Sequence, residues 1–207
     1  MRTLHFAVGV FIVFCLGIPV VFAQNNQYVD PKEQLLPFVD RVLEILTDEQ
    51  LRGENKKAER RQKIMDLAHE RFDFVETSKR VLPKEQWDEL SSEQQDHFVS
   101  LFKRLLEYAY ISKLEGYADQ KVTFIKQMVK GDRAVVQTEL IDKEAVLPVY
   151  YMMILKDQDW MIYDIWPDKV SIVKNYREQF AEILSKEHYA GLLKQLEERV
   201  ADLEKNG

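Results

Sequence analysis

Residues 121–165 read KVTFIKQMVKGDRAVVQTELIDKEAVLPVYYMMILKDQDWMIYDI, and this stretch decides the fold. Its apolar residues recur with a period of two, whereas those on either side recur with a helical period of about 3.6. Lys130-Gly131-Asp132 and Asp157-Gln158-Asp159 are typical of tight turns between antiparallel strands. The stretch therefore predicts a meander of about four strands.

The strand expected over residues 146–155 is apolar on both faces. Side chains alternate along a strand, so one face would carry Tyr151 and Met153 and the other Tyr150 and Met152. Such a strand is expected between two layers, or between a layer and a ligand. An ordinary core of bulky side chains and an apolar cavity lined by methionine and aromatic groups explain this surplus equally well.

Helical patterns flank the predicted sheet on both sides. Asp30-Pro31 is typical of a helix start, and Ser91 with Gln94 matches a capping box that opens a longer helix. Helical spacing resumes near Val173. This order predicts an α+β fold, with an antiparallel sheet cradled by N- and C-terminal helices. No linker divides residues 24–207, which are expected to form a single domain.

The first residues have the three-part pattern of a secretory signal peptide. Arg2 precedes an apolar run, Phe6 to Val21, that is shorter than the roughly 20 residues of a membrane-spanning helix. Val21-Phe22-Ala23 resembles a cleavage site. Cys15, the only cysteine, follows Phe14 rather than a small residue, which disfavours lipidation. We therefore expect residues 1–23 to be removed after Ala23 and the remaining chain to be soluble, periplasmic and free of disulfides.

The charge balance disfavours two classes of partner. The net charge is −6 at pH 7, so the protein as a whole does not attract nucleic acid or anionic lipid headgroups. The basic run from Lys56 to Lys63 could be a docking patch. Its interspersed acidic residues favour a solvated helix face instead.

Few residues have the spacing that a catalytic site requires. His69, His97 and His188 each stand alone on a predicted helix, so we expect no metal and no cofactor. Tyr163 and Asp164 form the most enzyme-like pair, but neighbours in a strand point to opposite faces. We expect a structural Asp164 and no enzyme activity. A small isomerase or hydratase that uses Asp164 and an adaptor with a filled core are the alternatives.

Three segments resemble the periplasmic phospholipid-binding MlaC family, also called the toluene-tolerance family. They are YISKLEGY at residues 110–117, WMIYDI at 160–165 and VSIVKNYREQF at 170–180. The resemblance implies a nuclear-transport-factor-like sheet cradled by helices, with acyl chains held between the two layers. The family has Glu-Gly before Val-Ser, where this chain has Asp168-Lys169. The local turn and the pocket rim are therefore expected to differ.

The resemblance also implies a function and partners. The protein would be a monomeric carrier that shuttles a phospholipid between an outer-membrane lipoprotein complex and an inner-membrane ABC transporter with an MCE-domain subunit, and so maintains outer-membrane lipid asymmetry. A carrier in a hopanoid or other lipid pathway is the alternative. The predicted lipid-binding residues are apolar ones expected to face between the layers: Leu101, Leu105, Tyr110, Phe124, Tyr151, Met153, Ile165, Val170 and Val173.

Overall fold

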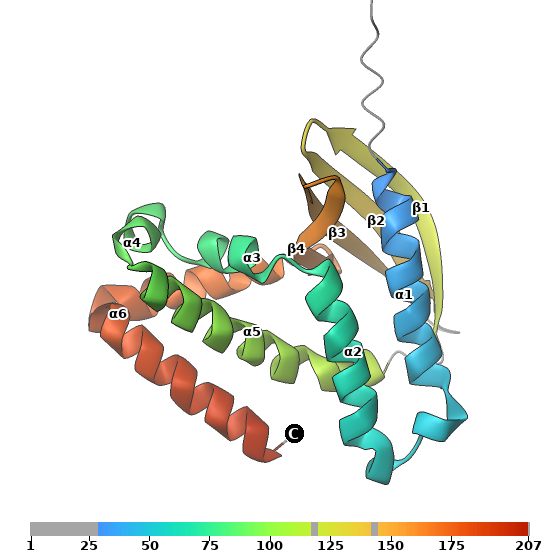
Figure 1. Cartoon of the computed structure of the whole chain (residues 1–207), viewed down its shortest axis with the longest axis horizontal. Coiled ribbons are helices and arrows are strands. Elements are labelled where there is room, and N and C mark those ends of the chain that lie inside the picture. The colour runs from blue at the N-terminus through green and yellow to red at the C-terminus, as the bar shows by residue number, and fades with distance from the viewer. Residues whose placement is uncertain (1–28, 117–119, 142–144, 207) are drawn as a thin grey trace, which may run out of the picture.

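A four-stranded antiparallel sheet lies at one side of the molecule (Figure 1). The computed structural model describes residues 29–116, 120–141 and 145–206, so the predicted signal peptide lies outside the described residues. The strands pair in chain order: β1 (Lys121–Lys130), β2 (Arg133–Ile141), β3 (Val146–Lys156) and β4 (Asp159–Pro167). The predicted meander and the α+β class are therefore confirmed.

Helices precede and follow the sheet. Those that precede it are α1 (Pro31–Thr47), the short turns η1 (Glu49–Leu51) and η2 (Glu54–Lys56), α2 (Lys57–Arg71), α3 (Phe74–Val81), α4 (Lys84–Glu89) and α5 (Ser92–Glu115). After the sheet comes α6 (Ile172–Asn206), whose two limbs meet at a kink at His188 (φ 57°). The helix α4 was not predicted, because its six residues are too few to show a period.

The predicted helix starts are confirmed by their hydrogen bonds. The Asp30 side chain accepts from the Lys32 backbone N–H at 2.9 Å, and Pro31 occupies the first helical position. At α5 the Ser91 Oγ accepts from the Gln94 N–H, while the Gln94 side chain accepts from the Ser91 N–H. Each such cap stabilises a helix by about 1 kcal/mol. Among the described residues, none of the helices has both the length and the apolar character that a membrane span requires.

The helix α1 covers one face of the sheet near the β1–β2 turn. Leu35 of α1 packs there against Met153, Trp160 and Ile162, all with exposed fractions of 0%. The Trp160 backbone N–H donates to the Gln34 side chain at 2.6 Å, which joins α1 to β4. This end of the sheet is therefore closed by a solid core.

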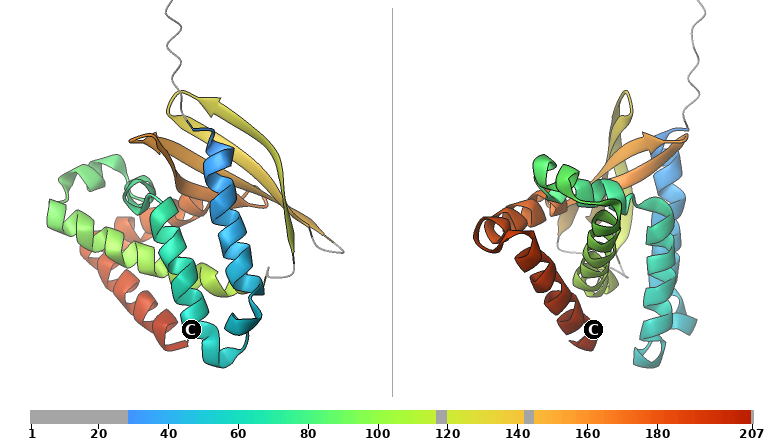
Figure 2. Two further views of the ribbon diagram at one scale, coloured as in Figure 1. Left: turned by 45° about the vertical axis from the view of Figure 1, so that its right-hand side comes forward. Right: turned by 60° about the vertical axis from the view of Figure 1, so that its left-hand side comes forward.

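The helices α5 and α6 form a second layer with its own core (Figure 2). Phe102 lies at its centre, with ring centroids 5.2 Å from Tyr176, 5.5 Å from Phe180 and 6.0 Å from Phe98. The Tyr176 and Phe180 rings are near perpendicular to the Phe102 ring, an arrangement that aromatic pairs favour. The space between this layer and the α1–sheet layer holds the candidate site.

Candidate functional site: an apolar cavity between helices and sheet

An apolar cavity of about 260 Å³ lies where α1, α2 and α5 meet the sheet. The helices supply long aliphatic side chains, among them Val42, Leu43, Ile64, Met65, Leu106 and Leu114. The sheet supplies Val122, Leu140, Leu147, Val149, Tyr151 and Ile165. Each strand contributes because alternate residues of a strand point to the same face. The cavity is therefore suited to an apolar ligand.

Tyr110 and Tyr151 of the cavity wall, and the neighbouring Tyr176, stay uncharged near neutral pH. Burial raises the pKa of Tyr151 above its ordinary value, and the Thr138 side chain offsets part of this rise. Burial also raises the pKa of Tyr110 and brings that of Tyr176, whose hydroxyl contacts the Tyr110 hydroxyl, to about 12. These phenols can donate or accept hydrogen bonds, but they do not act as bases near neutral pH.

Asp164 borders the cavity as a fully engaged carboxylate. One of its oxygens accepts from the Trp166 indole at 2.5 Å and from the Ser171 hydroxyl at 2.6 Å. The other accepts from the Val173 backbone N–H at 3.0 Å. These bonds tie β4 to the start of α6 and give each oxygen at least one donor from the protein. The geometry supports the expected structural role of Asp164.

Of the predicted lipid-binding residues, the structure places four on the cavity wall. Tyr151 and Ile165 face each other across the β3–β4 pair. Tyr110 approaches from α5 and Val173 from the start of α6. These four come from four different elements, and the structure brings them together at one cavity. Whether they touch a lipid remains a prediction.

Leu101 and Leu105 do not line this cavity, and their contact with a lipid stays a prediction. Both are buried, and Leu105 belongs to the core between α5 and α6, where it also lines a second depression. The cavity is lined instead by the next face of the same helix, with Leu106, Tyr110 and Leu114 one turn apart. Because α5 is buried on two faces, its apolar stripe alone did not show which face meets the cavity.

Phe124, Met153 and Val170 do not line this cavity either. Phe124 and Met153 lie on the correct face of the sheet but pack into the solid core beneath α1. Val170 is 59% exposed. The two residues before it, Asp168 (φ 48°) and Lys169 (φ 64°), adopt the left-handed conformation. That conformation favours glycine, and the turn that it makes leaves Val170 pointing outward.

Sequence reasoning missed the part of the wall that α1 and α2 supply. Phe38, Leu43 and Ala68 line the cavity from α1 and α2. The apolar period of these helices signalled a buried face, but a helical period does not tell a packed face from a cavity wall. That distinction depends on the distance between layers.

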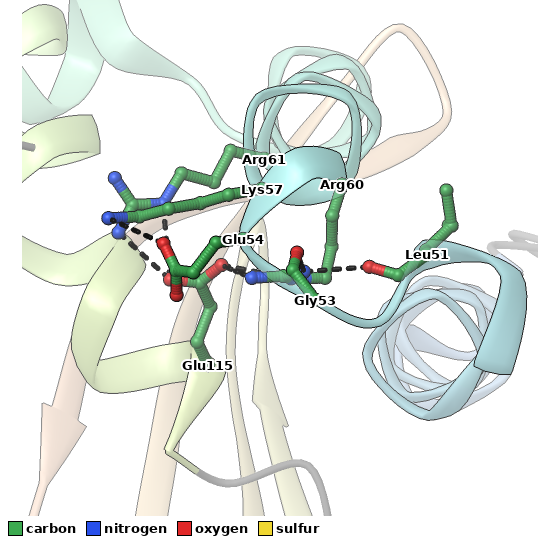
Figure 3. A network of polar contacts seen from close by, with 7 residues as sticks. All are labelled: Leu51, Gly53, Glu54, Lys57, Arg60, Arg61 and Glu115. Carbon is green, nitrogen blue, oxygen red and sulfur yellow. Dashed lines mark hydrogen bonds and ion pairs between the residues drawn. The ribbon is translucent and has the colours of Figure 1, made fainter.

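A half-buried charge cluster joins the start of α2 to the end of α5 (Figure 3). Glu115 accepts from Arg60 at 2.6 Å and from Arg61 at 2.9 Å, and Arg60 also donates to the Leu51 carbonyl at 2.7 Å. Burial alone would raise the pKa of Glu115, but the bonds from Arg61 and Arg60 outweigh it and hold the pKa below its ordinary value. The interpretation of this basic run as a solvated face is thus wrong for both arginines. They join α2 to α5.

The histidines do not form a metal site with other described residues. His69 contacts Glu107 at 2.5 Å, and His97 contacts Glu197 at 3.2 Å, each on a neighbouring helix. Within the part of the chain that the structure describes, no group of three or more histidine, cysteine, aspartate or glutamate side chains could hold a metal ion.

Comparisons with known proteins agree with this geometry. The family model described as "MlaC protein" matches residues 37–198. A solved phospholipid-binding protein from Ralstonia solanacearum, in complex with a phospholipid, is similar in structure with a TM-score of 0.74. It is 25% identical in sequence, and the similarity covers 84% of this chain and 99% of that one. No match was found among the curated proteins. The family match spans most of the chain, and the protein therefore belongs to the MlaC family.

Proposed function

We propose that this protein binds a phospholipid by its acyl chains in the cavity between α1, α2, α5 and the sheet. The observation that carries the proposal is the composition of the wall, which is almost wholly aliphatic and aromatic. The solved relative from Ralstonia solanacearum holds a phospholipid, which supports the same class of ligand here.

The energetics of lipid transfer define what such a cavity has to do. Two acyl chains hold about 30 methylenes, each worth roughly 0.8 kcal/mol when kept from water. A bilayer gives nearly the same protection, so the cavity need only match it. The direction of transfer then depends on partners. We propose that these are an outer-membrane lipoprotein complex and an inner-membrane ABC transporter with an MCE-domain subunit, reached in the periplasm after removal of residues 1–23.

The size of the cavity implies that it opens. A cavity of about 150 Å³ is enough for benzene, so 260 Å³ holds part of an acyl chain rather than two whole chains. The α1–α2 pair would therefore move away from α5 as lipid enters. The bonds from Arg60 and Arg61 to Glu115 join the two sides that separate.

A carrier role explains why Asp164 and the phenols are arranged as they are. The carboxylate oxygens of Asp164 are both occupied by donors from β4 and α6. The phenols of Tyr110 and Tyr176 are neutral and face each other. These features support binding without turnover rather than an isomerase.

Filling the cavity tests the proposal. Ala68→Phe on α2 would place a ring in the cavity, whereas Ala58→Phe puts the same ring on the exposed face of the same helix. Native mass spectrometry of protein purified without detergent should show phospholipid on the wild type and on Ala58→Phe, and little on Ala68→Phe. If the wild type carries no lipid and takes up none from vesicles, the carrier function is wrong. N-terminal sequencing of the periplasmic protein should begin at Gln24.

A further inference from the structure

A second depression, of about 480 Å³, lies between α3, α4, β4 and the start of α6. We refer to it as the basic groove. It opens on the other face of the sheet, since Met152 and Trp166 line it while their neighbours Tyr151 and Ile165 line the cavity. Tyr163, Asp164 and Val173 border both. The proposed lipid function gives the basic groove no role.

The side chains that line the basic groove carry a net positive charge, although the protein as a whole is acidic. Five cationic side chains line it, Lys79, Arg80, Lys84, Lys174 and Arg177, but only two acidic ones, Glu76 and Asp164. The chain as a whole has a net charge of −6. The basic groove is therefore a local site of positive potential on an acidic protein.

Part of this charge is uncompensated. Arg80 pairs with Glu76 at 2.5 Å, Lys84 pairs with Asp88, and Lys174 lies 3.8 Å from Glu178. Lys79 and Arg177 are exposed, and neither has an ion pair with another residue that the structure describes. Asp164 is paired with neither of them; its oxygens accept from Trp166, Ser171 and Val173.

The floor of the basic groove is apolar and rigid. Trp87 is 6% exposed and Met152 is 8% exposed. Trp166 is held by its bond to Asp164, and the Arg80 guanidinium lies 4.2 Å from the centroid of the Tyr163 ring. A preformed apolar floor with a cationic rim is suited to an extended segment that carries both carboxylates and apolar side chains.

We propose that the basic groove docks an acidic segment of a partner protein. A flat anionic bilayer fits less well, because the rim also carries Asp88 and Glu178, which a plane of negative charge would meet together with the cations. An extended acidic peptide that enters between α3–α4 and α6 would meet Lys79 and Arg177, which have no ion pair with another described residue. Charge complementarity thus selects the peptide.

The experiment measures binding of a fluorescein-labelled oligoglutamate peptide by fluorescence anisotropy at low ionic strength. The wild type should bind it saturably, and added salt should weaken the complex. An oligolysine peptide of the same length should not bind. The triple variant Lys79→Gln, Lys174→Gln, Arg177→Gln should bind the acidic peptide roughly tenfold more weakly or worse.

The control variant removes the same charge elsewhere. Lys121, Lys126 and Lys130 are exposed on β1, at the opposite edge of the sheet from β4, so changing all three to Gln preserves the basic groove. This variant should bind the acidic peptide nearly as the wild type does. Thermal melting of both variants verifies folding.

Three outcomes would overturn the proposal. They are equal loss of affinity in both triple variants, no peptide binding by the folded wild type, and groove-dependent binding to phosphatidylglycerol vesicles without any to the peptide. The assay uses no bound lipid, so its result is separate from that of the Ala68→Phe experiment.

Discussion

The two interfaces of α5 are built from similar apolar residues but differ in how closely those residues are packed. Toward α6, Phe98, Phe102 and Phe180 interlock as a packed aromatic cluster, beside a depression that polar side chains of α6 also line. Toward α1 and the sheet, Leu106, Tyr110 and Leu114 face an empty volume. An apolar composition alone therefore does not identify a binding site. What separates the two interfaces is whether the facing element lies close enough for its side chains to fill the space.

Matched truncations on the two sides should give the largest difference. Phe102→Ala would leave a void in the solid core and should lower the free energy of unfolding by about 3–5 kcal/mol. Phe38→Ala on the cavity wall should cost less than half as much, since its ring is only partly packed. Urea titrations of both variants check this. Equal losses would show that the cavity side is as tightly packed as the aromatic core.

The Met153→Ala variant tests where, on the inner face of the sheet, the cavity ends and the solid core begins. Met153 shares a face with Tyr151 but is completely buried beneath α1. We expect its truncation to lower the free energy of unfolding by about 2–5 kcal/mol and to leave lipid content unchanged. A small loss of stability together with altered lipid content would instead show that Met153 lines the cavity.

Asp164→Asn tests the link between β4 and α6. The amide can accept from fewer donors than the carboxylate, so one of the groups on Trp166, Ser171 or Val173 loses its partner. The expected loss is about 1–3 kcal/mol in the free energy of unfolding. A variant with wild-type stability that loses a measurable turnover of lipid or steroid substrates would instead favour an isomerase.

Glu115→Gln should destabilise the protein by about 1–2 kcal/mol at neutral pH, because Arg60 and Arg61 lose a charged partner. The pKa of Glu115 is lowered in the folded state. The carboxylate therefore contributes its full stabilisation above the ordinary value of 4.5, and this is lost as the pH falls through the lowered pKa. Wild type and variant should accordingly converge in acid. If wild type and Glu115→Gln still differ in stability at acidic pH, the effect of the substitution comes from packing rather than from charge.

Val170→Glu should have the smallest effect. Val170 is exposed beside the β4–α6 turn, so the carboxylate stays in water and stability should change by no more than about 0.5 kcal/mol. Lipid content should equal that of the wild type. A variant that is stable but free of lipid would place Val170 in the path of the ligand.

The sequence by itself determined the order of elements, the strand faces and the helix starts. The period of two puts Ala134, Val136, Thr138 and Leu140 on one side of β2; the first three are buried there and Leu140 lines the cavity. The cap at Asp30 and the capping box at Ser91 were also predicted from the sequence. These features depend on residues close together in the chain, through periods and local hydrogen bonds, so a single sequence contains them.

Only the tertiary structure decided which apolar faces enclose space. It placed Tyr110 and Leu106 at the cavity but Leu105 in the solid core, although all three lie on one helix within five positions. It also paired Arg60 and Arg61 with Glu115, 55 and 54 residues away. The physical reason is that a cavity is a property of the distance between layers. That distance is set by all the contacts of α1, α2 and α5 together, and no local pattern encodes it.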